Sequence, residues 1–200
     1  MDKIETEKKL NIIIISGPSG AGEDSIIKGL SKRFPIEMII TTTHREMRTG
    51  ETQKNPYYFI SEDEFMKRIK KGDFFEYACQ YNGIHYGVTF EEIKRVQESG
   101  KIGIWKIEYK GVMSAKKLMP GIKAIFINAP LEILEQRIKR RDPNISEEYL
   151  KERAEYTKEW LKHRDIYDYE VNNEEGKLDE SIEKIAKIIE KELGEAPLKE

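Results

Sequence analysis

The chain has 200 residues, a length that suits one globular domain or one domain with an inserted lid. Its 35 Lys and Arg residues nearly balance its 37 Asp and Glu residues, which argues against a polybasic nucleic-acid-binding protein. A content of 38% hydrophobic and 10% aromatic residues can build a core, so a disordered acidic chain is excluded. One cysteine, Cys79, excludes an intramolecular disulfide and a multi-cysteine metal site. Because we find no bilayer-spanning apolar run and no signal-peptide pattern, we expect a cytoplasmic protein.

Short apolar segments alternate with amphipathic segments along the chain. The first apolar segment, residues 11–16, predicts a buried strand, and a glycine-rich turn and a helix that ends before Pro35 follow it. Further strands are predicted at 37–40, 57–60, 102–107, 124–128 and 167–171. Further helices are predicted at 61–71, 90–99, 131–140, 146–163 and 177–193. This alternation predicts an α/β fold with a parallel central sheet and helices on both faces.

Two stretches differ in composition from the rest of the chain. Residues 42–88 are richer in aromatic, polar and glycine residues, which indicates a small inserted subdomain with short strands. Residues 137–153 are highly charged and are predicted to form a mobile lid. The remaining segments, 10–41, 89–136 and 154–193, would then form the core of a single domain.

The turn at 17–22 has the glycine spacing of a phosphate-binding loop, GxxxxGK[ST]. In that loop, backbone N–H groups and a helix N-terminus hold the phosphates, a lysine reaches the outer phosphates, and a hydroxyl binds magnesium. Here Glu23 stands in the lysine position, Asp24 stands in the hydroxyl position, and Ser25 follows. A plain strand-to-helix turn with acidic first-turn residues would have the same composition. The loop alone therefore leaves both interpretations open.

Seven short motifs, taken together, resemble those of the guanylate kinase family. They are GPSGAG at 17–22, TTTHREMRTGE at 41–51, YYF at 57–59, FFEYA at 74–78, HYG at 85–87, RIKRR at 137–141 and DYEVNN at 168–173. The resemblance extends from about residue 11 to about residue 191. It implies a P-loop NTPase fold with a GMP-binding subdomain and a helical lid. It also implies a kinase that transfers the γ-phosphoryl group of ATP to GMP with the help of Mg²⁺.

By this resemblance, residues of the insertion would bind GMP. Arg45 and Arg48 can present two planar guanidinium groups to one phosphate, beside the phenols of Tyr57 and Tyr86. A carboxylate at Glu76 could accept from two adjacent N–H groups of guanine, which adenine does not offer. The predicted GMP-binding residues are Thr41, Arg45, Arg48, Tyr57, Glu76, Tyr86 and Glu108. A solvated charged loop and an ordinary strand glutamate are the alternatives.

The resemblance also implies an ATP site and a set of catalytic arginines. Arg137, Arg141 and Arg153 would stabilise the charge on the transferring phosphoryl group, whereas the alternative is a solvated charged helix. The predicted ATP-binding residues are Gly17, Ser19, Gly20, Ala21, Gly22, Glu23, Asp24, Ser25 and Asn173. Asp24 and Ser25 are also the predicted magnesium ligands, because their oxygens are hard ligands.

A second departure from the family falls on the strand predicted at 102–107. The family has an aspartate close to the loop lysine there, but this chain has Lys106, while Glu23 replaces the lysine. We predict that Lys106 supplies the ammonium group for catalysis and pairs with Glu23, because an unpaired acid would repel the phosphates. The alternative is a loss of catalysis that leaves a purely structural pair.

Three functions are compatible with these motifs. The first is guanylate kinase activity, with ATP and GMP as partners of a monomer or homodimer that binds neither nucleic acid nor membrane. The second is a weak or inactive module that binds GMP or a phosphopeptide. The third is a kinase for another acceptor such as ribose 1,5-bisphosphate. Asp24 and Ser25 resemble the end of the phosphate loop in the related ribose bisphosphate kinases. The lid arginines with Asn173 favour an enzyme, and Glu76 favours GMP.

Overall fold

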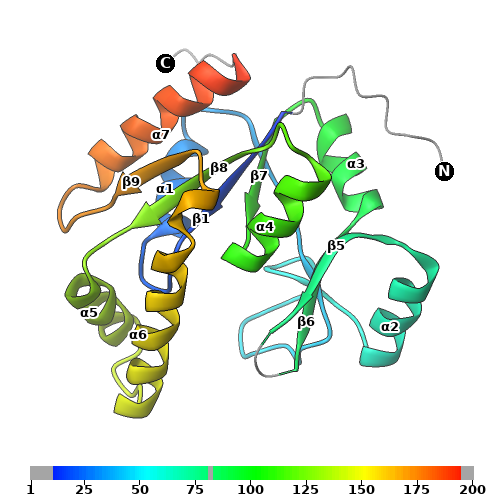
Figure 1. Cartoon of the computed structure of the whole chain (residues 1–200), viewed down its shortest axis with the longest axis horizontal. Helices are drawn as coiled ribbons and strands as arrows, with labels where there is room; N and C mark the ends of the chain where they lie inside the picture. Colours follow the sequence, from blue (N-terminus) through cyan, green and yellow to red (C-terminus); the bar gives the residue numbers. More distant parts are fainter. Residues whose placement is uncertain (1–10, 81–82, 195–200) are drawn as a thin grey trace.

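The structure is a computed structural model that describes residues 11–80 and 83–194. Its main element is a five-stranded sheet in the order β2-β7-β1-β8-β9, in which all neighbouring strands are parallel. The strands are β1 (Ile12–Ser16), β2 (Ile36–Met38), β7 (Ile102–Lys106), β8 (Lys123–Asn128) and β9 (Tyr169–Asn172). This sheet, with helices on both of its faces, confirms the predicted α/β class (Figure 1).

Helices cover both faces of the sheet and bury β1 completely. These helices are α1 (Glu23–Leu30), α3 (Phe90–Glu98), α4 (Tyr109–Leu118) and α7 (Leu178–Leu193). Ile13 belongs to the apolar cluster that the sheet forms with α1 and α7. Ile14, the next residue, belongs to the cluster on the other face with α3 and α4. The continuous apolar run of β1 therefore results from its position at the centre of a sheet that is covered on both faces.

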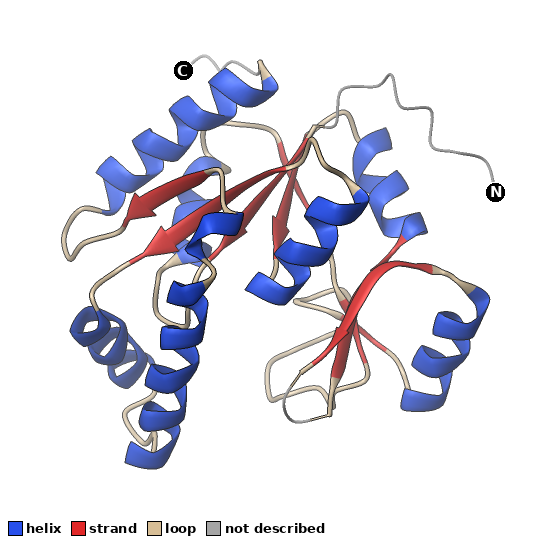
Figure 2. Cartoon of the chain, in the orientation of Figure 1, coloured by secondary structure: helices blue, strands red, loops and turns tan. Residues whose placement is uncertain are grey.

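A second, smaller sheet has the strand order β4-β3-β6-β5 and is separate from the first (Figure 2). Its elements are β3 (Thr42–Thr43), β4 (Tyr58–Phe59), β5 (Phe74–Cys79), β6 (His85–Thr89) and the helix α2 (Glu62–Lys71). The hydroxyl of Ser61 caps α2 by accepting from the N–H of Glu64. Phe65 of α2 is buried and stacks on Phe74, with 4.4 Å between ring centroids. This sheet extends over residues 42–89, close to the predicted segment 42–88, whose boundaries as a subdomain stay a prediction.

Two helices follow β8 and lie at the carboxyl edge of the main sheet (Figure 1). They are α5 (Leu131–Arg141) and α6 (Glu147–Lys162), and a short 3₁₀ turn (Arg164–Ile166) comes after them. Leu134 and Ile138 of α5 and Leu150 of α6 are buried, and the two helices contact each other. The segment 137–153 thus consists of parts of both helices and their connecting turn. Its mobility as a lid stays a prediction.

Helix α4 and the strands β3, β5 and β6 are missing from the ranges that the sequence predicts, and β5 and β6, with 6 and 5 residues, are not the short strands expected of the insertion. Gly111 lowers the intrinsic helix preference of the α4 segment, so no helical pattern stands out there. Val112 and Ala115 are nevertheless fully buried against the sheet, and this packing stabilises the helix. The predicted strands and helices are present with slightly different ends. None of the helices in the described residues is long and apolar enough to cross a membrane.

Candidate active site

The loop between β1 and α1 depends on its glycines. Gly20 and Gly22 have φ angles of 91° and 97°, in the left-handed region that favours glycine. A Cβ on Gly22 would lie 2.5 Å from Nδ2 of Asn173. That Nδ2 donates a hydrogen bond of 2.7 Å to the carbonyl oxygen of Ala21. Asn173 thus holds a tight turn at the N-terminus of α1, a place where backbone N–H groups and the helix dipole favour an anion.

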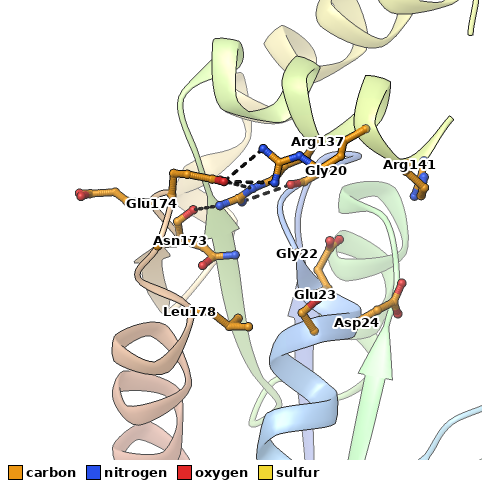
Figure 3. A pocket seen from close by; sticks show the side chains of 13 residues that line it. Gly20, Gly22, Glu23, Asp24, Arg137, Arg141, Asn173, Glu174 and Leu178 are labelled. Carbon is orange, nitrogen blue, oxygen red and sulfur yellow. Dashed lines mark hydrogen bonds and ion pairs between the residues drawn. The ribbon is translucent and has the colours of Figure 1, made fainter. Parts of the chain in front are cut away.

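A cleft of about 430 Å³ lies beside this loop (Figure 3). The structure brings most of the predicted ATP-binding and lid residues together around it, namely Gly20, Gly22, Glu23, Asp24, Ser25, Arg137, Arg141 and Asn173. Gly17, Ser19 and Ala21 belong to the same loop but do not line the cleft. We call this cavity the donor cleft.

Arg137 is held at the edge of the donor cleft by several acceptors. Its Nη2 donates to the carbonyl oxygen of Asn173 at 3.0 Å, and its Nε lies 3.3 Å from a carboxylate oxygen of Glu175. Its Nη1 lies 3.4 Å from the carbonyl oxygen of Gly20. Figure 3 shows these contacts between α5, the loop and the segment after β9. A positive charge from the predicted lid is therefore fixed next to the phosphate loop.

Lys106, at the end of β7, pairs with Asp24 and not with Glu23. Its Nζ lies 2.5 Å from Oδ1 of Asp24, in the first turn of α1. The prediction that Glu23 is its direct partner is therefore wrong. Successive residues of a helix point about 100° apart, so only one of the two acids can face β7. The pair joins two cavities, because Asp24 lines the donor cleft and Lys106 lines the acceptor pocket described below.

Glu23 directs its carboxyl group into the donor cleft (Figure 3). Burial raises the pKa of this carboxyl to about 7, and this effect is only partly offset by hydrogen bonding to the backbone of Glu23 and Gly22 and by the charge of Lys106. An acidic group thus lies at the loop position where the usual phosphate loop has a lysine. Its raised pKa reduces the negative charge at neutral pH.

The oxygens of Asp24 and Ser25 suit a magnesium ion that is bound mainly through phosphates. Both residues are exposed in the first turn of α1 and line the donor cleft. No group of three His, Cys, Asp or Glu residues that could hold a metal ion occurs in the described part of the chain. Magnesium commonly keeps several waters and takes only one or two protein ligands beside a nucleotide, so this small donor set fits it.

A second cavity, of about 200 Å³, lies between the small sheet and the carboxyl end of β7. We call it the acceptor pocket. It is lined by six predicted GMP-binding residues, Thr41, Arg48, Tyr57, Glu76, Tyr86 and Glu108, and by the predicted catalytic residues Lys106 and Arg153. These residues come from the small sheet and its loops, from the end of β7 and the N-cap of α4, and from α6.

Glu76 is the most unusual group in the acceptor pocket. Its residue is 7% exposed, and its Oε2 is buried without a hydrogen-bond partner. Burial alone raises the pKa of this carboxyl to about 8. Because buried polar atoms are nearly always satisfied, an orphaned carboxylate oxygen that lines a cavity indicates a ligand with N–H or O–H donors.

Arg45 does not line the acceptor pocket with Arg48. Its Nη2 lies 2.8 Å from Oε1 of Glu51, and its guanidinium lies 5.4 Å from the ring centroids of Tyr57 and Phe59. The other oxygen of Glu51 accepts from the backbone N–H of Arg48 at 2.7 Å. Glu51 thus orders both arginines, a role that the sequence analysis misses. The sequence signals for that role are its position shortly after both arginines and its place at the end of the motif at 41–51.

Tyr156 is a second residue that the sequence analysis misses. It lies on α6, one turn after Arg153, and its hydroxyl donates to Oε2 of Glu108 at 2.6 Å. A bond between residues so far apart in sequence leaves no signal in spacing or composition. It connects the helix that carries Arg153 with the end of β7.

Comparisons with known proteins agree with this geometry. The family model described as guanylate kinase matches residues 9–192. The guanylate kinase of Rickettsia felis is 36% identical over 180 residues, which cover 89% of this chain and 92% of that protein. The guanylate kinase of Caldanaerobacter subterraneus is also 36% identical over 180 residues, covering 89% of this chain and 85% of that protein. A crystal structure of guanylate kinase from Anaplasma phagocytophilum has the same fold, with a TM-score of 0.69 and 24% identity over 92% of this chain and 87% of that one. The chain belongs to the guanylate kinase family.

Proposed function

We propose that this protein is a guanylate kinase, which transfers the γ-phosphoryl group of magnesium-bound ATP to GMP and gives ADP and GDP. Membership of the family supports the reaction. The observation that carries the choice of acceptor is the buried, unpartnered carboxyl of Glu76 in the acceptor pocket. Guanine presents two adjacent N–H donors to such a carboxylate, whereas adenine has no N–H group at the equivalent ring nitrogen.

The phosphate of GMP would lie at the side of the acceptor pocket that carries Arg48, Tyr57 and Tyr86. The rings of Tyr57 and Tyr86 contact each other, with 5.6 Å between centroids, so both hydroxyls are positioned by packing. A guanidinium and two phenols supply the donors that a phosphate dianion requires. Arg45 would contribute through its contact with Tyr57 or after it leaves Glu51.

Lys106 is the proposed replacement for the missing loop lysine. Lys106 lines the acceptor pocket and pairs with Asp24 of the donor cleft. Its ammonium group would therefore lie between the two substrates. With Arg137, Arg141 and Arg153 it would neutralise charge on the transferring phosphoryl group. Asp24 and Ser25 would hold Mg²⁺, which would supply further charge neutralisation at the phosphates. Direct in-line transfer needs no covalent intermediate.

A coupled assay of ADP release with Mg-ATP tests this function. We expect turnover with GMP and at most weak turnover with AMP or ribose 1,5-bisphosphate. Absence of GMP-dependent turnover would contradict the proposal. If isothermal titration calorimetry then detected binding of GMP, the second candidate, a binding module, would take its place. Glu23 in the lysine position is the observation that favours that candidate.

The role of Lys106 is tested by Lys106→Met in the same assay. We expect kcat to fall by about 100-fold or more, because a charge that acts only on the transition state is lost. Lys101→Met is the matched control. Lys101 lies just before the other end of β7 and also pairs with an acid, Glu37, at 3.0 Å. Near-normal turnover of Lys106→Met would contradict the assigned role and leave only a structural ion pair.

A further inference from the structure

The hydroxyl of Tyr156 joins the lid helix α6 to the carboxyl end of the main sheet. It donates to Oε2 of Glu108 at 2.6 Å, and Glu108 is the N-cap residue of α4 directly after β7. The ring of Tyr156 packs near those of Tyr109 and Trp160, at centroid distances of 6.0 Å and 6.4 Å. The ring is therefore placed by aromatic packing, and the hydroxyl reaches past it to Glu108.

This hydrogen bond has a neutral donor and an ionisable acceptor. Burial raises the pKa of the Tyr156 hydroxyl, and the bond to Glu108 raises it further, so the phenol keeps its proton. A hydroxyl that donates to a carboxylate forms a shorter and stronger bond than one between two neutral groups. The contact is thus suited to fix the direction of the Glu108 carboxylate.

The two halves of α6 are attached to the molecule differently. Near its C-terminal end, Trp160 is buried in a cluster with Tyr109 and Phe126 of the core. Near its N-terminal end, Leu150 lies beside α5, which is itself part of the predicted lid. Between these ends, the bond from Tyr156 to Glu108 attaches the helix to the sheet.

The residue that this attachment places is Arg153. Arg153 lies one turn before Tyr156 and lines the acceptor pocket together with Glu108 and Lys106. Its guanidinium lies 4.8 Å from the ring centroid of Tyr149, which is one further turn toward the N-terminus of α6. The position of this arginine over the pocket therefore depends on the position of the middle of α6.

We propose that Tyr156 is a positioning residue, whose hydroxyl orients the Glu108 carboxylate in the acceptor pocket and holds the turn of α6 that carries Arg153 over it. The inference rests on the proposed function, because its main consequence is the rate of GMP phosphorylation. Without the hydroxyl, the Glu108 carboxylate is free to turn toward Lys106 and the phosphate of the acceptor. The turn that carries Arg153 then also loses its hydrogen bond to Glu108.

Tyr156→Phe tests the proposal, because it keeps the packed ring and removes only the hydroxyl. We expect kcat/KM for GMP to fall by about tenfold, as for loss of one hydrogen bond to a charged group, while KM for ATP stays within about twofold. Tyr149→Phe is the matched control, since it removes a hydroxyl from the same helix but keeps the ring under Arg153. We expect it to leave kcat/KM for GMP within about twofold of the wild type.

A double-mutant cycle separates the proposed role from a general effect on stability. If Tyr156 acts through Glu108, Tyr156→Phe changes kcat/KM for GMP by less than about twofold in a Glu108→Ala background. An equal loss in both backgrounds would overturn the proposal, and so would unchanged kinetics of Tyr156→Phe in the otherwise intact protein.

Hydrogen exchange of the nucleotide-free protein supplies a readout that does not depend on turnover. Amides of residues 147–156 are expected to exchange about fivefold faster in Tyr156→Phe than in Tyr149→Phe, because the middle of α6 has lost its hydrogen bond to Glu108. If the wild type does not phosphorylate GMP, the proposed function fails, and this measurement alone decides the role of Tyr156. Equal exchange in the two variants would then overturn it.

Discussion

Acidic side chains are partnered differently in the donor cleft and in the acceptor pocket. In the donor cleft, Asp24 is paired with Lys106 at 2.5 Å, and burial raises the pKa of Glu23 to about 7. In the acceptor pocket, Glu76 is buried with an oxygen that has no partner. In the donor cleft the charge of Asp24 is satisfied by a lysine and that of Glu23 is reduced by burial, whereas the acceptor pocket leaves an oxygen of Glu76 open to a ligand.

This difference predicts how the two substrates bind. ATP has to compete with contacts that already exist around the phosphate loop. Substitutions there should therefore change activity through the net charge beside the phosphates. GMP completes a hydrogen-bond set that is unfinished in the free protein, so its recognition should depend strongly on one residue. Variants that replace the charged residues of one cavity therefore test this difference between the donor cleft and the acceptor pocket.

The largest effect is expected for Glu76→Gln. An amide accepts from one N–H of guanine but presents an NH₂ group to the other, so kcat/KM for GMP should fall by about 100-fold or more. At neutral pH the unliganded variant should melt at a higher temperature than the wild type, because glutamine does not ionise and so lacks the loss of stability that the raised pKa of Glu76 causes. Steady-state kinetics and thermal unfolding check the two parts.

Glu91→Gln is the control, since Glu91 is an exposed glutamate at the start of α3. It should change neither GMP kinetics nor the melting temperature measurably. A Glu76→Gln enzyme with wild-type selectivity for GMP over AMP would remove the basis for the acceptor assignment.

The next largest effect concerns the exchanged charges at positions 23 and 106. Lys106→Asp should lower kcat by about 100-fold, because three acids then gather at the phosphates without an ammonium group. Adding Glu23→Lys to this variant gives the arrangement that the sequence resemblance ascribes to the family. The double variant should recover at least about tenfold of the lost activity, as expected of coupled neighbours. Additive losses would show that the two positions act independently.

A smaller effect follows from the pKa of Glu76. Because burial raises that pKa to about 8, the carboxyl is mostly neutral below pH 8 and has to lose a proton before it accepts from both guanine N–H groups. The affinity for GMP should therefore rise by up to about tenfold per pH unit from about pH 6 to pH 8 and then level off. Calorimetry in buffers of different ionisation enthalpy should detect the released proton.

The same shift has an opposite consequence for the stability of the unliganded protein. The folded pKa of about 8 lies above the ordinary value of 4.5, so the folded state binds the proton more tightly than the unfolded state. The stabilisation from this group is complete below about pH 4.5 and is lost as the pH rises through 8. The stability of Glu76→Gln should not show this dependence on pH. An affinity for GMP that does not change with pH would contradict the raised pKa of Glu76.

The parts of the site that depend on local backbone geometry could be predicted from the sequence. The glycines at 20 and 22 define the loop through their φ angles, and the apolar run of β1 defines the strand before it. The motifs also contain most of the predicted residues that line the two cavities, although Arg45 lines neither of them. These features depend on short segments whose physical requirements are visible in the residues themselves.

The side-chain partners could not be predicted in the same way. Glu23 and Asp24 are adjacent, and only the rotation of α1 relative to β7 decides that Asp24 faces Lys106. Tyr156 and Glu108 come from different elements and meet because α6 packs on the core cluster of Trp160. Such contacts result from tertiary packing, which a single sequence does not specify at the level of individual atoms.

The smallest expected effect is that of Glu51→Gln. This variant tests whether the ion pair between Glu51 and Arg45 supports the binding of GMP. Glu51 holds Arg45 at 2.8 Å and accepts from the backbone of Arg48, so it orders the loop that would contact the phosphate of GMP. A glutamine keeps one acceptor oxygen but loses the charge, and KM for GMP should rise by about threefold with kcat nearly unchanged. Glu46→Gln, an exposed glutamate of the same loop, is the control. If KM for GMP fell instead, the Glu51 carboxylate would be competing with the phosphate of GMP for Arg45. The acceptor side would then resemble the donor cleft, because a carboxylate of the protein would occupy the cation that a substrate phosphate needs.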